Sequence, residues 1–257
     1  MPVYGNIRPH HGIIWEVDAN KQHWATSQTS GLADGTGITL SSTMPGITAD
    51  IDGDTVQYII GDYGDADVGG AYFQWDATHE GMIRLIAADA TAANQWNDAT
   101  SLTGMVWFQS DNSSRQVVIA RYHGANSVYH WNQIVDPNGE MHYNSSGVIS
   151  GAAGDINSDT GWDANTWHLF CLSYNVDDGY FRWYIDGDEK ASRDVGMDSG
   201  AGVSGYSDNT QWWSIGSRSD QVESLHGKIA VARLYNRALN TAEMNELYQT
   251  ERQRFHK

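Results

Sequence analysis

Residues 167–190 read WHLFCLSYNVDDGYFRWYIDGDEK, and this stretch decides the fold. In the run YFRWYI the apolar side chains Phe181, Trp183 and Ile185 alternate with more polar ones, so they share one face of an extended chain. An Asp-Gly pair lies on each side of this run, and Asp-Gly supplies the backbone freedom that a tight hairpin turn requires. The stretch therefore predicts antiparallel strands, each with one face buried.

Short runs of β-branched and aromatic residues, separated by clusters of Gly, Asn, Asp and Ser, recur outside this hairpin. Examples are TVQYIIGDY (55–63), LTGMVWFQ (102–109) and KIAVARLYN (228–236). Many short strands divided by turn residues are typical of a β-sandwich or barrel. We therefore expect an all-β fold, an antiparallel two-sheet jelly-roll sandwich, with one short C-terminal helix.

The expected helix follows residue 240. Asn240 can cap its first turn, and Glu243, three residues later, completes the pattern of a capping box. Met244, Leu247 and Tyr248 then recur at the spacing of one helical face. The segment predicts a single amphipathic helix that lies as a lid on the sandwich.

The composition of the chain excludes several classes of partner. Its 257 residues carry 15 Lys and Arg against 32 Asp and Glu, a formal net charge of -17. Nucleic-acid binding depends on a basic patch that releases counterions from phosphates, so no nucleic-acid partner is expected. No apolar run is long enough to cross a bilayer, and the N-terminal residues lack the pattern of a signal peptide. The single cysteine, Cys171, lies in an alternating apolar run and predicts a buried, inert thiol.

Three segments of the second half, residues 165–192, 212–220 and 226–248, resemble one known family. They contain a Trp-His strand start, a Tyr-Ile-Asp-Gly hairpin, an Ile-Gly strand and the ending YNRAL before the helix. This arrangement resembles the laminin G-like, concanavalin A-like lectin and glucanase superfamily. The positions that carry the resemblance are Trp167, His168, Tyr174, Tyr184, Asp186, Gly187, Ile215, Gly216, Gly227, Tyr235, Asn236, Arg237, Leu239, Glu243 and Leu247.

The resemblance implies how the chain is divided. Residues 61–257 are expected to form the laminin G-like β-sandwich domain. Residues 1–60 match the family weakly and are expected to form an N-terminal arm and the first strands. Most of the motif residues report the fold and say little about activity.

The superfamily that the chain resembles also includes glycoside hydrolases, which carry two glutamates on one strand. Retaining hydrolysis needs such carboxyl groups about 5 to 5.5 Å apart. The nearest approach here is Glu16 and Asp18, but Asn20 and Lys21 follow, so the second glutamate is missing. The motif also lies far too early in the chain. We therefore expect no enzymatic activity and assign no catalytic residue.

A polysaccharide lyase is the alternative enzyme. Such a lyase needs a Tyr or His base beside groups that neutralise a uronate. The runs VIARYHG (118–124) and VYHWNQIVD (128–136) offer these residue types, although ordinary strand packing also explains them and the motifs of known lyases are not found. The candidates are Arg121, Tyr122, His123, Tyr129, His130 and Gln133.

Calcium is the cofactor that the sequence allows. Hard cations take carboxylate and carbonyl oxygens from loops, and residues 50–67 are rich in Asp. The segment is not an EF-hand loop, because Thr55 and Gly61 stand where Gly and Glu are required. Two acidic turns without an ion are the alternative. The candidate ligands are Asp50, Asp52, Asp54, Asp62, Asp65 and Asp67.

Aromatic platforms are the remaining candidate for a binding site. Sugar rings pack their C–H faces on Trp or Tyr, while polar loops bond the hydroxyls. Four tryptophans lie next to such loops, although burial in the core is the alternative for each. In the pair Trp212 and Trp213, alternation predicts one ring in the core and one outside. The candidates are Trp96, Trp131, Trp162 and Trp212.

These expectations combine into one functional hypothesis. A shallow lectin site binds with an affinity near millimolar, so useful binding requires many copies. A chain with a lectin fold and no signal peptide is expected on the surface of a bacteriophage virion. Such a chain would be made in the cytoplasm of the host cell. We expect a non-catalytic structural protein, a capsid decoration, fibre or tail adhesin. Its partners would be other virion proteins, copies of itself and cell-surface polysaccharide; a bacterial surface lectin is the second alternative.

Overall fold

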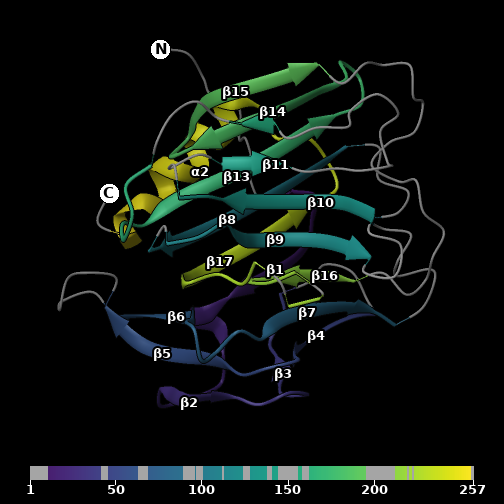
Figure 1. The fold of residues 1–257 in the computed structure, drawn as a ribbon. Helices are drawn as coiled ribbons and strands as arrows, with labels where there is room; N and C mark the ends of the chain where they lie inside the picture. Colours follow the sequence, from purple (N-terminus) through teal and green to yellow (C-terminus); the bar gives the residue numbers. More distant parts are fainter. Residues whose placement is uncertain are drawn as a thin grey trace.

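The computed structural model places the described strands in two antiparallel sheets (Figure 1). The core side chains of the two sheets pack between them, as in a sandwich. The residues that the structure describes are 11–41, 46–62, 69–88, 96, 101–111, 113–123, 128–137, 141–143, 156–157, 162–194, 212–218, 220–221 and 223–255.

The first sheet has nine strands in the order β15-β14-β13-β8-β17-β6-β5-β2, and β1 pairs with β17 outside this path. The last strand of the chain thus lies in the middle of the sheet. Its strands are β1 (Ile13–Asp18), β2 (Gln28–Leu32), β5 (Val56–Asp62), β6 (Gly69–Trp75), β8 (Leu102–Ser110), β13 (His168–Asn175), β14 (Tyr180–Ile185), β15 (Asp188–Asp194) and β17 (Gly227–Tyr235).

The second sheet has eight strands in the order β12-β11-β10-β9-β16-β7-β4-β3. The predicted class, an all-β antiparallel two-sheet jelly-roll sandwich with one short C-terminal helix, is confirmed. The strands are β3 (Gly37–Ile38), β4 (Ile47–Asp52), β7 (Met82–Ala87), β9 (Gln116–His123), β10 (Val128–Val135), β11 (Met141–Tyr143), β12 (Ile156–Asn157) and β16 (Trp213–Ile215).

The N-terminal segment contributes strands to both sheets. β1, β2 and β5 belong to the nine-stranded sheet, and β3 and β4 belong to the eight-stranded sheet. The expected boundary between residues 60 and 61 falls inside β5. Residues 13–60, as far as the structure describes them, are therefore part of the sandwich, while residues 1–10 lie outside the described residues.

The decisive hairpin consists of β13 and β14, which pair in antiparallel register. Phe181, Trp183 and Ile185 are buried in the core between the sheets, which confirms the face that alternation predicted. The turn after β14 uses two left-handed residues, Asp186 with φ 52° and Gly187 with φ 85°. The same Asp186 accepts a hydrogen bond from the backbone N–H of Leu169 at 2.9 Å, so its side chain also joins the turn to β13.

The C-terminal helix α2 (Thr241–Glu251) begins as predicted. The Asn240 side chain accepts from the backbone N–H of Glu243 at 3.0 Å, and the Glu243 carboxylate accepts from the backbone N–H of Asn240 at 3.0 Å. This reciprocal pair is a capping box, which satisfies two N–H groups that a helix start leaves unbonded. Within the described part of the chain, no helix has the length and apolarity needed to span a bilayer.

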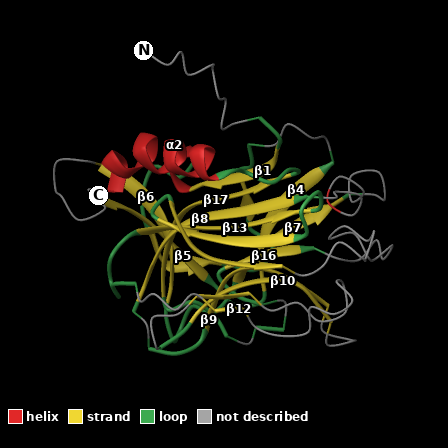
Figure 2. Cartoon of the chain, turned by 90° about the horizontal axis from the view of Figure 1, so that it is seen from above, coloured by secondary structure: helices red, strands yellow, loops and turns green. Residues whose placement is uncertain are grey.

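Helix α2 lies over one face of the nine-stranded sheet (Figure 2). Its residues Met244 and Leu247 are buried in an apolar cluster with Trp107 of β8. The 3-10 turn η4 (Arg252–Phe255) adds Phe255, whose ring stacks on Trp107 with centroids 4.1 Å apart. The helix thus covers the outer side of the nine-stranded sheet. Within the described residues, no helix covers the outer face of the eight-stranded sheet.

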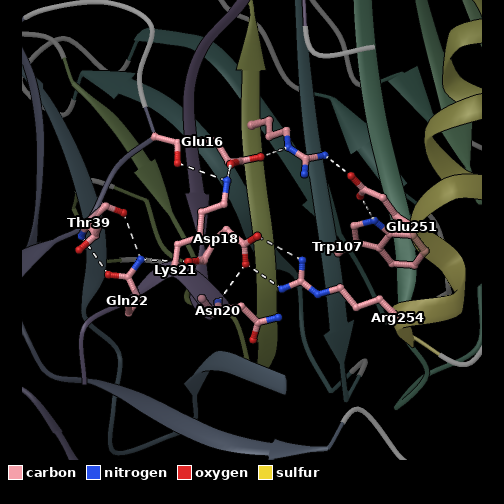
Figure 3. Close-up of polar contacts among 12 residues, drawn as sticks. Glu16, Asp18, Asn20, Lys21, Gln22, Thr39, Trp107, Glu251 and Arg254 are labelled. Carbon is pink, nitrogen blue, oxygen red and sulfur yellow. Dashed lines mark hydrogen bonds and ion pairs between the residues drawn. The ribbon is translucent and has the colours of Figure 1, made fainter. Parts of the chain in front are cut away.

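A buried network of charges joins the two ends of the chain (Figure 3). Arg233 of β17 donates to Glu16 of β1 and, through Nη1, to Oε1 of Glu251 in α2 at 2.6 Å. The indole N–H of Trp107 donates to the other oxygen of Glu251 at 2.7 Å. Lys21 donates to Glu16 from the partly exposed side. The network therefore ties the first strand, the last strand and the helix to one another.

Candidate ligand-binding face

Five residues lie opposite one another across five strands of the eight-stranded sheet. Asn132 of β10 pairs with Ala120 of β9, which pairs with Ser214 of β16. Ser214 pairs with Arg84 of β7, which pairs with Asp50 of β4. Adjacent strands lie about 4.8 Å apart, so this outer row spans roughly 20 Å across the sheet.

Alternation along the strands shows which way the outer row points. The sequence neighbours Trp131, Trp213 and Ile83 are fully buried members of the core between the sheets. Successive side chains of a strand point to opposite faces. The outer row therefore lies on the face of the eight-stranded sheet that points away from the core.

Several polar groups of this face are buried and have no hydrogen-bond partner among the described residues. They are both side-chain polar atoms of Asn132, the hydroxyl of Ser214 and the indole N–H of Trp212, which precedes β16. Asn132 is 0% exposed and Ser214 is 1% exposed. An unsatisfied buried group costs about 1–3 kcal/mol, and native proteins contain few of them. On the core side of the same strands, Nε2 of Gln133 and the indole N–H of Trp213 also lack partners. The outward groups differ in lying on the face that carries the partly exposed Trp212 and Arg84, where the hydroxyls of a ligand can approach.

Arg84 closes the other end of the outer row. Its guanidinium donates to both oxygens of Asp50, at 3.2 and 3.0 Å, and lies 2.9 Å from an oxygen of Asp52. Its carbon Cζ also lies 5.7 Å from the centroid of the Trp212 ring. Burial raises the pKa of Asp52; Arg84 opposes this shift, and the nearby charges of Asp34 and Asp50 add to it. This end of the row is thus charged, whereas the Asn132 and Ser214 end is neutral.

The same contacts bear on the predicted calcium ligands. Asp50 and Asp52 share one face of β4, and Arg84 lies directly opposite Asp50, so a guanidinium is the cation beside both. Asp54 bonds the backbone N–H of Thr55 at 2.7 Å. No group of three or more His, Cys, Asp or Glu that could hold a metal ion occurs in the described part of the chain. The remaining candidates, the side chain of Asp62 and residues Asp65 and Asp67, lie outside the described residues, so calcium there stays a prediction.

The four predicted tryptophan platforms divide into two groups. Trp96, Trp131 and Trp162 are 0%, 0% and 7% exposed and belong to the core cluster. A ring enclosed between two sheets has no face to offer a sugar in this structure. Trp212 is only partly buried, whereas Trp213 is fully buried, so alternation in this pair was predicted correctly. Trp212 is therefore the predicted platform that reaches the outer row.

Two of the predicted lyase residues point into the sandwich. Gln133 accepts a hydrogen bond from the indole N–H of Trp131 at 3.0 Å, and both side chains face the core. Arg121 pairs with Trp131 in register, and burial lowers the pKa of its guanidinium to about 10. Both Gln133 and Arg121 are thus enclosed away from the outer row. The side chains of Tyr122, His123, Tyr129 and His130 lie outside the described residues.

A second candidate site is a hollow of about 380 Å³ on the side of the nine-stranded sheet that carries α2. Gln74, Lys228 and Gln109 lie opposite one another across β6, β17 and β8 in its wall. The acids Asp76 and Asp111 in the lining are each held by hydrogen bonds from neighbouring residues. Because these bonds come from the chain itself, the hollow has less unused bonding capacity than the outer row.

Asp76 in this hollow makes a testable contribution to stability. Burial opposes its charge, but hydrogen bonds from Thr78 and His79 outweigh burial and lower the pKa of Asp76 from 3.8 to about 2. A carboxyl group whose pKa falls on folding adds stability above its unfolded value and loses it as the pH falls through the folded value. Asp76→Asn is therefore expected to lower the midpoint of urea unfolding at neutral pH. The difference from the wild type should shrink between pH 4 and pH 2; a pH-independent difference would contradict this assignment.

Sequence reasoning missed Asn132, Ser214 and Arg84. Their polarity was visible at outward positions of apolar strands, and that was the available signal. Their alignment was not visible, because β16 lies between β9 and β7 although it comes far later in the chain.

The two antiparallel sheets, with a helix on one outer face and a polar row on the other, define a lectin-like β-sandwich. A model of the concanavalin A-like lectin/glucanases superfamily matches residues 86–245, and the chain belongs to this superfamily. No curated protein matches the sequence significantly.

Solved structures with similar folds include a carbohydrate-binding module, the binding domain of a neurotoxin and a sialidase. The CBM40 of the Ruminococcus gnavus IT-sialidase, bound to α2,3-sialyllactose, is 12% identical with a TM-score of 0.53, and 61% of this chain and 86% of that chain are covered. The binding domain of botulinum neurotoxin DC in complex with SialylT is 12% identical with a TM-score of 0.60, and 95% of this chain and 52% of that chain are covered. A Trypanosoma rangeli sialidase is 14% identical with a TM-score of 0.56, and 96% of this chain and 34% of that chain are covered. This chain thus spans about half of the neurotoxin domain and a third of the sialidase. At these identities the likeness shows the fold alone.

Proposed function

We propose that the protein is a non-catalytic lectin that binds a glycan on the outer row of the eight-stranded sheet. The observation that carries the proposal is the cluster of buried, unpartnered polar groups at Asn132, Ser214 and Trp212. A sugar hydroxyl both donates and accepts, so a row of hydroxyls can bond an amide, a hydroxyl and an indole N–H together. The R. gnavus module, a similar sandwich, is bound to sialyllactose, so a fold of this kind can hold a glycan.

The arrangement of carboxylates supports binding without catalysis. Glycoside hydrolysis uses two carboxyl groups, one of which is protonated and delivers its proton to the leaving group. Asp50 and Asp52 instead both pair with the guanidinium of Arg84, whose nitrogens lie 3.0 and 2.9 Å from their oxygens. Two of the possible lyase groups, Arg121 and Gln133, face the core. The described residues of the outer row therefore favour recognition over turnover.

Asn132→Leu tests the proposed site. Leucine has the same branched heavy-atom skeleton as asparagine, a larger volume and no polar atoms, so the substitution removes two buried groups that lack partners. We expect the free energy of unfolding to stay unchanged or to rise by about 1 kcal/mol, while glycan binding on an array falls at least about tenfold. A variant that gains stability and loses binding identifies a group that is kept for a ligand.

The matched control is Asn245→Leu on the exposed surface of α2. This substitution makes the same chemical change on the opposite side of the molecule. It should leave glycan binding as in the wild type. Binding that survives Asn132→Leu, or that falls equally in both variants, would refute the outer row as the site.

We further propose that the protein is displayed in many copies on a particle, as a capsid decoration, fibre or adhesin of a bacteriophage virion. The support is energetic, since a single shallow site near millimolar affinity corresponds to only about 4 kcal/mol, whereas several linked sites gain about a hundredfold or more. Mass spectrometry of purified particles should detect the chain in repeated copies. Its presence in a cell-envelope fraction and absence from particles would favour a bacterial surface lectin instead.

A further inference from the structure

We infer that the outer row selects an uncharged sugar and discriminates against sugars that carry a carboxylate. This inference rests on the proposed function and specifies its ligand class. The similar R. gnavus module is bound to a sialylated sugar, so the inference separates this protein from a protein of similar fold. It is carried by two observations, the bonding capacity of the neutral end of the row and the charge of its other end.

The neutral end needs a partner that donates as well as accepts. Asn132 presents an unpartnered acceptor, Oδ1, beside an unpartnered donor, Nδ2, and the Ser214 hydroxyl can do either. Asn132 and Ser214 lie two strands apart, about 10 Å, so separate hydroxyls of an oligosaccharide can bond these atoms. A carboxylate only accepts, so an acidic sugar could bond Oδ1 of Asn132 only through a hydroxyl, with its carboxylate directed elsewhere along the row.

The charged end repels an anion. Arg84 provides the positive charge, and it faces both Asp50 and Asp52, so one guanidinium is outnumbered by two carboxylates. Three of its N–H groups already point at these carboxylates. The sequences of β4, β7 and β16 contain no other Lys or Arg. An incoming carboxylate therefore meets a net negative charge and an arginine whose bonding capacity is largely used.

The whole chain acts in the same direction as this local pattern. Its formal net charge is -17, and a net charge of one sign lowers the local concentration of ligands with the same sign. Such long-range repulsion is screened by salt, whereas repulsion at close range within a partly buried site is screened less. Selectivity that persists at high salt would therefore come from the outer row.

The experiment uses the full chain on an array printed with matched pairs, each a neutral oligosaccharide and its sialylated or uronate-bearing derivative. We expect the neutral member of a bound pair to bind about tenfold more tightly, as repulsion from a unit charge roughly 10 Å away implies. The array is read at low and at high salt. Tighter binding of the acidic member would leave the proposed function intact and overturn this inference, whereas no binding of any pair, neutral or acidic, would overturn both.

Asp50→Asn and Asp52→Asn test the cause of the selectivity. Each removes one negative charge beside Arg84 with little change of shape, so the affinity ratio of acidic to neutral sugar should rise about tenfold. The matched control is Asp188→Asn on β15, whose side chain is 70% exposed and belongs to the other sheet. It removes the same charge from the chain, and the ratio should stay within about twofold because surface charges this distant are screened. Equal shifts in all three variants would show that net charge, and not the outer row, sets the preference.

Discussion

Replacing Arg233 by alanine is expected to lower the free energy of unfolding by about 3–5 kcal/mol. The Arg233 side chain is 5% exposed, and its partners Glu16 and Glu251 are 7% and 14% exposed. The substitution leaves the largely buried Glu251 without the cation that it shares with Glu16, and it leaves the buried Glu16 with only the half-exposed Lys21. An uncompensated buried charge is costly because water no longer solvates it. Urea unfolding followed by tryptophan fluorescence measures the change.

Two comparisons separate buried charge from lost packing. Arg115→Ala removes an arginine that is 38% exposed and lies 3.5 Å from Glu223, and exposed pairs contribute less than about 1 kcal/mol. Adding Glu16→Gln and Glu251→Gln to Arg233→Ala removes the uncompensated charges and should recover a large part of the loss. Equal losses from the two arginine variants, with no recovery, would contradict an electrostatic role for the network.

The effect of Arg233→Ala should also depend on pH. Burial opposes the charge of Glu16, but Arg233 and Lys21 outweigh it and lower the pKa of Glu16 from 4.5. A carboxyl group with a lowered pKa contributes stability above its unfolded value, and this contribution is lost as the pH falls through the folded value. The gap between wild type and variant should therefore be widest above about pH 5 and narrow below it.

Much of the fold could be predicted from local sequence patterns. The period-two alternation of Phe181, Trp183 and Ile185 and the Asn240–Glu243 capping box each depend on neighbours within a few residues. Such patterns identify a strand face or a helix start without knowledge of the partner. The family motifs added the two-sheet class, so the hairpin, the helix and the class were confirmed together.

The candidate site could not be predicted in the same way, because it depends on strand order. Asn132, Ser214 and Arg84 come together only because β16 inserts between β9 and β7. Nothing local to any of these three residues encodes that neighbour. The tryptophans show the converse difficulty, since a large ring next to a polar loop fits a core position as well as a platform. Polar residues at outward positions of apolar strands were the more informative signal for this site.

Trp131→Ala is expected to lower the free energy of unfolding by about 3–5 kcal/mol, as truncation of a fully buried aromatic ring does. The Trp131 ring is 0% exposed and lies 6.0 Å, between centroids, from both Phe181 and Trp213. Its N–H donates to Gln133, so the substitution also leaves the acceptor of a buried amide without its partner. The loss should be visible as a lower midpoint in urea or heat.

The matched substitution Trp212→Ala separates core from platform. Trp212 is partly exposed and its ring lies beside Arg84 on the outer face, so truncation should cost clearly less stability than Trp131→Ala while weakening glycan binding. If the two substitutions have these opposite effects, Trp131, which faces the core, serves folding, and Trp212, which lies on the outer face of the same sheet, serves recognition. A stable Trp131→Ala variant that has lost glycan binding would instead make Trp131 a contact residue and move the binding site away from the outer row.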